Sequence, residues 1–312
     1  MSKIDRVLRS NLKLRHLQLL VALDQFRHLG RAAEFLAVTQ PAVSKTLAEI
    51  ERMLDMTLFE RSTRGTEPTA AGVSMVRFAR SVLAGFERTR DEMAAEASGT
   101  RGRTSVGAMV VATPVLLARA VEQLKARSAQ TTVIVEEGDL TRLLPKLRMG
   151  ELDLFVGRLE PGYASSDLET EALYDEPMVA VVRPGHALLA QPASWQALAD
   201  MPCVMPPPWA SLRVKLEQQF FAHGLHPPAD LVESASFLSQ ISFLHQRGAV
   251  AFMARGVAEH FAQQGLVAVL DLPVPIDLPP VGLITLRGQP MTATTRLLVE
   301  CLRAVGNGLA SR

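Results

Sequence analysis

From Arg103 onward, short runs rich in β-branched residues alternate with segments of helical periodicity. The predicted strands are Thr104–Ala108, Thr132–Glu136, Leu152–Gly157, Met178–Val182, Ala249–Met253 and Val281–Leu286. The predicted helices are Val115–Arg127, Leu140–Met149, Leu212–His223, Leu238–Gln246, Val257–Gln264 and Ala293–Val305. This alternation predicts an α/β fold with largely parallel sheets, since crossover helices return the chain in the same direction. A chain of 312 residues is long enough for two or three domains.

Composition narrows the class of protein. Two cysteines, Cys203 and Cys301, are too few for a disulfide scaffold or a cysteine metal site. The basic N-terminus precedes no clean apolar segment, and no stretch approaches the ~20 residues of a membrane-spanning helix. Residues 1–98 carry 15 Lys/Arg and 12 Asp/Glu, a net charge of +3, whereas residues 99–312 carry 18 and 20, a net charge of −2. This mild asymmetry permits DNA binding and equally fits an ordinary solvated surface. We expect a cytoplasmic protein without membrane partner, metal or cofactor.

The N-terminal part shows three short helical patterns separated by tight turns. The first runs over Leu14–Phe26, and the second over Arg31–Leu36 after Gly30. The third begins after Thr39, a favourable N-cap, and places Pro41 in its first turn, where the missing N–H costs nothing. Its core face is formed by apolar residues at offsets 0, 4, 7 and 11: Val43, Leu47, Ile50 and Leu54.

Polar side chains occupy the rest of the third helix. Two short helices joined by a tight turn form a helix-turn-helix, whose second helix enters the major groove. Gln40 can bond adenine in a bidentate manner, Ser44 a base or a phosphate, and Lys45 a guanine edge or a phosphate. The following segment, 58–69, predicts a β-wing that places Arg61 and Arg64 against phosphates or the minor groove. Taken singly, these patterns also fit a three-helix bundle and a charged hairpin in solvent.

An ordered series of motifs over residues 15–72 is more specific. It comprises Arg31-Ala32-Ala33-Glu34-x-Leu36, Thr39-Gln40-Pro41-Ala42-Val43-Ser44, Ile50-Glu51, Leu58-Phe59-x-Arg61 and Thr69-x-Ala71-Gly72. In this series the chain resembles the winged helix-turn-helix of LysR-type transcriptional regulators. The resemblance implies that DNA is bound by Arg31, Thr39, Gln40, Pro41, Ser44, Lys45, Arg61 and Arg64. The family usually has Ser or Thr at the position of Gly30, and we expect glycine to serve as the N-cap with a small loss of stability.

Residues 69–98 predict one long helix with small or apolar residues spaced alternately three and four apart. They are Gly72, Met75, Ala79, Val82, Phe86, Thr89 and Met93. Such a heptad pattern fits either pairing with a second copy or packing on the helix's own domain. The resemblance implies the first: a linker helix that joins two subunits, so that two recognition helices meet DNA about 34 Å apart. Members of the family often assemble further into tetramers.

Residues 103–312 resemble the effector-binding part of the same family, with two α/β subdomains around a cleft, as in periplasmic binding proteins. The stretches RHLQ, LDLFVGRL and VMPPPWASLR are most similar to regulators of aromatic-acid (protocatechuate) catabolism and to the galactose-binding-protein regulator group. The resemblance implies an effector site formed by Met109, Val111, Thr113, Arg158, Ser211, Arg213, Ser236 and Phe252. The two arginines would pair with a carboxylate. Each of these residues also fits a purely structural role.

The expected organisation is therefore a winged helix-turn-helix domain over 1–68, a linker helix over 69–98, and two effector subdomains. These are 103–175 plus 276–312, and 176–275. The predicted function is sequence-specific transcriptional regulation in response to a small aromatic or carboxylate effector. Promoter DNA, a second copy of the chain and RNA polymerase are the expected macromolecular partners.

Two alternatives remain open. An enzyme is disfavoured because the sequence contains no Gly-x-Ser-x-Gly, phosphate-binding glycine loop, His-Glu-x-x-His or Cys-x-x-Cys motif. The histidines show no metal-ligand spacing tied to carboxylates. A solute-binding or transport component fits the cleft fold, but the N-terminal motifs oppose it.

Overall fold

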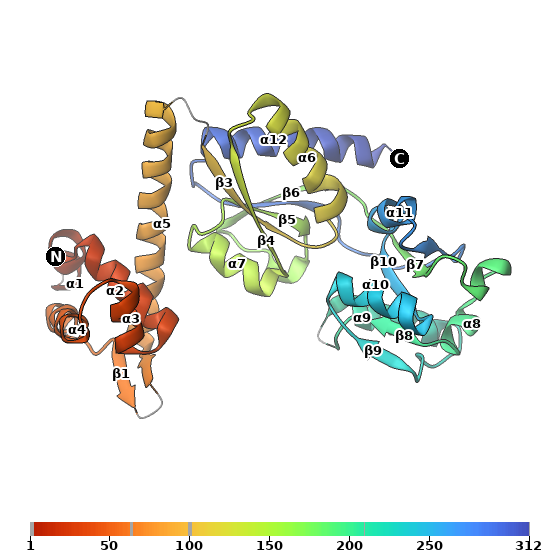
Figure 1. Ribbon diagram of the computed structural model, residues 1–312, viewed down its shortest axis with the longest axis horizontal. Coiled ribbons are helices and arrows are strands. Elements are labelled where there is room, and N and C mark those ends of the chain that lie inside the picture. Colours follow the sequence, from red (N-terminus) through yellow and green to blue (C-terminus); the bar gives the residue numbers. More distant parts are fainter. Residues whose placement is uncertain (1–2, 63–64, 99–101, 209, 312) are drawn as a thin grey trace.

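The computed structural model describes residues 3–62, 65–98, 102–208 and 210–311. An N-terminal module, one long helix and two α/β subdomains follow one another along the chain (Figure 1). The module and the long helix contain α1 (Lys3–Arg6), a π-helical turn (Val7–Asn11), α2 (Leu14–Phe26), α3 (Leu29–Phe35), α4 (Gln40–Leu54), β1 (Phe59–Ser62), β2 (Gly65–Pro68) and α5 (Ala70–Ser98).

The N-terminal module is a helical core with an antiparallel β1–β2 hairpin beside it. The predicted first and third helices are confirmed, and the expected core face of α4 is buried. The second helix begins at Leu29, earlier than expected, and the prediction that Gly30 caps it was wrong. His28 is the cap: its Nδ1 accepts hydrogen bonds from the amides of Gly30 at 3.1 Å and Arg31 at 3.4 Å. The imidazole thus satisfies two first-turn N–H groups that glycine would leave without a side-chain acceptor.

The start of α5 is fixed against the wing. The Thr69 hydroxyl donates to the Thr57 carbonyl at 2.8 Å and accepts from the Gly72 amide at 3.0 Å. A Cβ added to Gly72 would lie 2.0 Å from the Leu58 carbonyl oxygen. Only glycine therefore allows the helix to pass so close to this backbone.

The heptad pattern of α5 divides into two halves. Ala79 is buried in the core of the N-terminal module, and Met75 and Val82 are partly buried against it. Further along, Phe86 and Met93 are 50% and 67% exposed. The first half of the helix thus packs on its own module, and the second half presents two large apolar side chains to solvent.

The first effector subdomain contains a five-stranded sheet in the order β4-β3-β5-β12-β6. Its elements are β3 (Arg103–Ala108), a π-helical turn (Thr113–Leu117), α6 (Ala118–Arg127), β4 (Thr132–Glu137), α7 (Leu140–Arg148), β5 (Leu154–Arg158), a 3-10 turn (Pro161–Tyr163), β6 (Leu168–Tyr174), β12 (Val281–Leu286) and α12 (Ala293–Ala310). Helices α6 and α12 cover one face and α7 the other (Figure 1). Alternate residues of β5 serve the two layers: Leu154 and Val156 pack toward α6 and α12, and Phe155 toward α7.

The second subdomain contains a sheet in the order β11-β7-β10-β8-β9. Its elements are β7 (Met178–Val182), a 3-10 turn (Ala187–Ala190), α8 (Trp195–Ala199), β8 (Cys203–Met205), α9 (Ser211–Ala222), β9 (Leu231–Glu233), α10 (Phe237–Arg247), β10 (Val250–Ala254), α11 (Arg255–Gln263) and β11 (Ala268–Val269). The chain enters it after β6 and leaves it before β12, so two crossing segments join the subdomains.

Both sheets are mixed, and the expectation of largely parallel sheets was wrong. In the first, β12 runs antiparallel to β5 and β6; in the second, β7 runs antiparallel to β10 and β11. These pairs involve the strands next to the crossings, where no crossover helix restores the direction. The strands named from the sequence also omit β6, β8, β9 and β11, of which the last three have only two or three residues. Within the described ranges, no helix has the length and apolar character needed to cross a bilayer.

Candidate nucleic-acid interface and ligand region

The polar side of α4 is presented to solvent. Thr39 caps the helix by accepting from the Ala42 amide at 3.4 Å, and Pro41 lies in the first turn. The predicted contact residues of α3 and α4 are exposed, with Ser44 half-buried: Arg31, Thr39, Gln40, Pro41, Ser44 and Lys45. The Gln40 amide oxygen would lie 3.8 Å from a Cβ placed on Gly30, so the N-terminus of α4 adjoins the start of α3. Arg31 and Gln40 thus belong to neighbouring parts of one exposed surface.

The wing is held to the helices by hydrogen bonds that its backbone amides donate. The Glu51 carboxylate on α4 accepts from the amides of Leu58 at 2.7 Å and Phe59 at 3.1 Å. On the other strand, the Thr66 amide donates to the Arg27 carbonyl at 2.9 Å. Arg61 belongs to β1 and pairs with Thr66 across the hairpin, whereas Arg64 lies outside the described residues. The wing is therefore a fixed extension of the helix-turn-helix.

Arg158 does not offer its charge to a ligand, contrary to the expectation from sequence. It is 6% exposed, and its guanidinium donates to the carbonyls of Glu176 at 2.6 Å and Pro279 at 2.9 Å. These acceptors belong to the two segments that cross between the subdomains. Burial lowers the pKa of Arg158 because the charged form loses hydration. The residue ties the two crossings together.

Arg213, predicted from sequence as a carboxylate partner, is engaged within its own subdomain. It is buried at the start of α9, with ion pairs to Glu217 at 2.6 Å and Glu233 at 3.0 Å. A further donor reaches the Pro206 carbonyl at 3.1 Å. These bonds engage the Nε and Nη1 groups of the guanidinium.

Two other predicted ligand residues belong to apolar cores. Val111 is buried in the core that the two subdomains share. Phe252 on β10 is buried between Trp195 and Phe220, with ring centroids 5.9 Å and 6.5 Å away. Both residues are apolar, and periodicity alone does not separate a pocket wall from a core.

The remaining predicted residues lie at element ends. The Thr113 hydroxyl donates to the Met109 carbonyl at 3.1 Å and to the Glu137 carboxylate at 3.3 Å. Ser211, at the start of α9, donates to the Glu160 carboxylate of the first subdomain at 3.3 Å. Ser236 caps α10, and the Met109 side chain packs over Gly157. Of these hydroxyls, Ser211 is bonded across the two subdomains; Glu137 and Glu160 are partners that the sequence motifs did not suggest.

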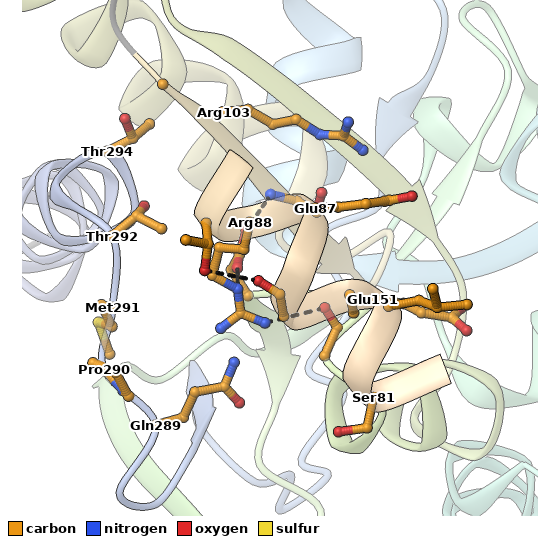
Figure 2. Close-up of a pocket in the computed structure, with 18 of the residues that line it drawn as sticks. Ser81, Glu87, Arg88, Arg103, Glu151, Gln289, Pro290, Met291, Thr292 and Thr294 are labelled. Carbon is orange, nitrogen blue, oxygen red and sulfur yellow. Dashed lines mark hydrogen bonds and ion pairs between the residues drawn. The ribbon is translucent and has the colours of Figure 1, made fainter. Parts of the chain in front are cut away.

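A cavity of about 1360 Å³ opens elsewhere, between α5 and the first effector subdomain (Figure 2). Residues of α5 line one wall, and the segment around Gln289–Thr294 lines the other (Figure 2). Its charged lining consists of Arg80, Glu87, Arg88, Arg103, Arg148, Glu151, Asp153 and Arg296. Across the described part of the chain, no cluster of three or more His, Cys, Asp or Glu side chains is arranged to hold a metal ion.

Family models cover nearly the whole chain. Residues 14–73 match the model described as "Bacterial regulatory helix-turn-helix protein, lysR family", and residues 97–307 match "LysR substrate binding domain". The first match contains the exposed α3–α4 surface and the wing, and the second contains both mixed sheets.

Individual proteins agree in length and architecture. The chain is 33% identical to the HTH-type transcriptional regulator GbpR of Azospirillum brasilense over 304 residues, covering 96% of this chain and 88% of that protein. It is 30% identical to the HTH-type transcriptional regulator PcaQ of Agrobacterium fabrum, covering 96% of each. The crystal structure of full-length CbnR complexed with its target DNA has the same fold, with a TM-score of 0.70 at 19% identity, covering 94% of this chain and all (100%) of that one.

Proposed function

We propose that α4 and the wing bind an operator in promoter DNA, since this chain belongs to the LysR family of bacterial transcriptional regulators. The family is one of DNA-binding regulators and not of enzymes. The proposal rests on the exposed N-terminal half of α4, where the side chains of Gln40 and Lys45 are exposed to solvent. Side chains of these types at this end of a recognition helix contact bases and phosphates.

DNA from upstream of the protein's own gene provides the test. In fluorescence anisotropy, we expect Lys45→Ala to weaken binding on all sequences and to reduce the salt slope by about one. We expect Gln40→Ala to cost about 1–3 kcal/mol and to relax preference at one base pair. Arg183→Ala, on the second subdomain, is the control and should bind as the unmodified protein does. If no fragment from this region shows an increase in anisotropy with the unmodified protein at moderate salt, the proposal fails.

We propose further that the protein acts as a dimer, or as a tetramer of two such dimers, and engages RNA polymerase at the promoter. The exposed apolar stripe on the second half of α5 supports a helix–helix contact between copies, since large exposed apolar side chains mark association surfaces. A dimer also supplies the two reading heads that a symmetric operator needs.

A small aromatic or carboxylate-bearing effector, bound between the subdomains, is the proposed signal. The N-terminus of α9 supports this, because Ser211 bonds to Glu160 of the other subdomain there and helix N-termini favour anions. Because the Arg158 guanidinium already binds two carbonyls, we expect hydroxyl and backbone donors to contribute to effector binding. Thermal-shift measurements with protocatechuate, cis,cis-muconate and galactose test the class; stabilisation by the sugar alone would contradict it.

A further inference from the structure

The N-terminal module and the effector region are joined by polar contacts. Among the described residues, the hydrophobic cluster of the N-terminal module and those of the effector region have no member in common. Beside their junction lies the cavity described above, so the two bodies are not tightly packed there (Figure 2). Specific polar side chains must therefore set how the two bodies are placed.

Arg80 on α5 bridges the two bodies with one guanidinium. One nitrogen lies 3.1 Å from the carboxylate of Asp24, on α2 of the N-terminal module. Another lies 3.1 Å from the carboxylate of Glu151, in the turn between α7 and β5 of the effector region. The rigid planar fork of arginine suits such a double contact, because it fixes the relative direction of both acceptors.

From Asp24 the ion pairs continue to the wing. The other Asp24 carboxylate oxygen lies 2.8 Å from the Arg27 guanidinium, which also pairs with Glu67 on β2. Arg27 holds the same strand through its backbone, since its carbonyl accepts from the Thr66 amide at 2.9 Å. Five charges of alternating sign thus run from the effector region to the wing: Glu151, Arg80, Asp24, Arg27 and Glu67.

From Glu151 the connection continues to the crossings between the subdomains. Asp153, two residues on, accepts from the Ser105 amide at 2.8 Å and lies 3.9 Å from Arg88 of α5. Strand β5 follows directly, is wholly buried, and lies in the middle of its sheet. It ends at Arg158, which holds both crossing segments. The buried strand β5 therefore connects the crossings to the turn in which Glu151 pairs with Arg80.

We propose that Arg80 is a positioning residue through which the effector region sets the placement and rigidity of the wing. The inference rests on the proposed function, in which the wing contacts DNA. A change at the crossings moves β5 and its preceding turn, which loosens or tightens the Arg80–Glu151 pair. Partly exposed ion pairs are individually weak and exchange readily, so a modest difference between two arrangements can shift the connection.

Hydrogen exchange on the full-length protein tests this without effector or DNA. Glu151→Gln removes the negative charge from the partner of Arg80 in the effector region, which converts the ion pair into a weaker neutral hydrogen bond, and leaves the pair of Arg80 with Asp24 in place. We expect amides of β2 to exchange at least about twofold faster in this variant, although Glu151 touches no wing residue. Unchanged exchange in β2, with faster exchange confined to the α7–β5 turn, would overturn the proposal.

Two further variants separate the connection from general loosening. Glu171→Gln breaks the 2.8 Å pair with Arg303 on the same subdomain and should leave β2 unaffected. If it accelerates β2 as much as Glu151→Gln does, the proposal is wrong. Asp24→Asn and Glu151→Gln, which share Arg80, should combine non-additively in their effect on β2. If the unmodified protein does not bind the DNA, only the proposed function is contradicted, because the exchange measurement is made without DNA.

Discussion

Two glycines on the same helix have opposite surroundings. A Cβ on Gly72 would meet the Leu58 carbonyl oxygen at 2.0 Å, whereas a Cβ on Gly85 would meet nothing within 4 Å. The first glycine is required by a close approach of two backbones, and the second only weakens the helix.

This contrast predicts opposite effects on stability. Gly72→Ala should destabilise the protein by about 1–3 kcal/mol, since α5 must move away from the wing. Gly85→Ala should raise the stability by about 0.5–1 kcal/mol through improved helix propensity. Urea unfolding followed by circular dichroism checks both changes, and a stabilising Gly72→Ala would refute the close approach.

His16 is the buried titratable group of the N-terminal module. It is 1% exposed, its Nδ1 accepts from the Lys13 amide at 3.3 Å, and its Nε2 has no hydrogen-bond partner among the described residues. Burial lowers its pKa below the ordinary 6.5; Arg15 and Lys13 lower it further, and Glu49 opposes them.

Protonation of His16 destabilises the folded state. Because the folded pKa lies below the unfolded one, the unfolded chain binds the proton more readily, and stability is lost as the pH falls below about 6.5. We expect the melting temperature to fall less between pH 7 and 5.5 in His16→Gln than in the unmodified protein. His226→Gln, at an exposed position, should follow the unmodified curve. Parallel curves for all three would show that His16 does not contribute.

At the scale of elements, α5 serves the N-terminal module along its first half and presents apolar side chains along its second. Phe86 and Met93 are exposed and lie on a common face of the helix, seven residues apart. A stripe of this kind suits pairing with the same helix of a second copy.

Phe86→Asp should therefore weaken self-association at least about tenfold, because a charge would be buried in the helix–helix contact. Sedimentation velocity over a dilution series measures it. Leu189→Asp, at another exposed apolar position, should keep the mass of the unmodified protein. An unchanged mass for Phe86→Asp would place the contact elsewhere.

At the scale of the whole molecule, Arg158 holds together the two crossings on which the relative placement of the subdomains depends. Arg158→Leu should cost about 2–4 kcal/mol, because two buried carbonyls lose a charged donor. We also expect faster hydrogen exchange at the amides of residues 175, 176, 277 and 278. Arg183→Leu, outside the crossings, should change neither quantity, and a neutral Arg158→Leu would leave the crossings held by other contacts.

The sequence alone determined those features that depend on neighbours along the chain. The cap of α4 by Thr39, the core face Val43–Leu54, the antiparallel wing and most central strands follow from local periodicity and capping chemistry. Prediction from local sequence failed at the start of α3, where the N-cap is the His28 side chain and not Gly30.

Only the tertiary structure decided which charges are already used. Arg158 was predicted as a ligand-binding arginine, yet its guanidinium donates to carbonyls of the two crossings, 18 and 121 residues away. The same holds for Arg80, whose partners lie 56 and 71 residues away. Hydrogen bonding and burial depend on which segments meet in space, and one-dimensional spacing carries no record of such meetings.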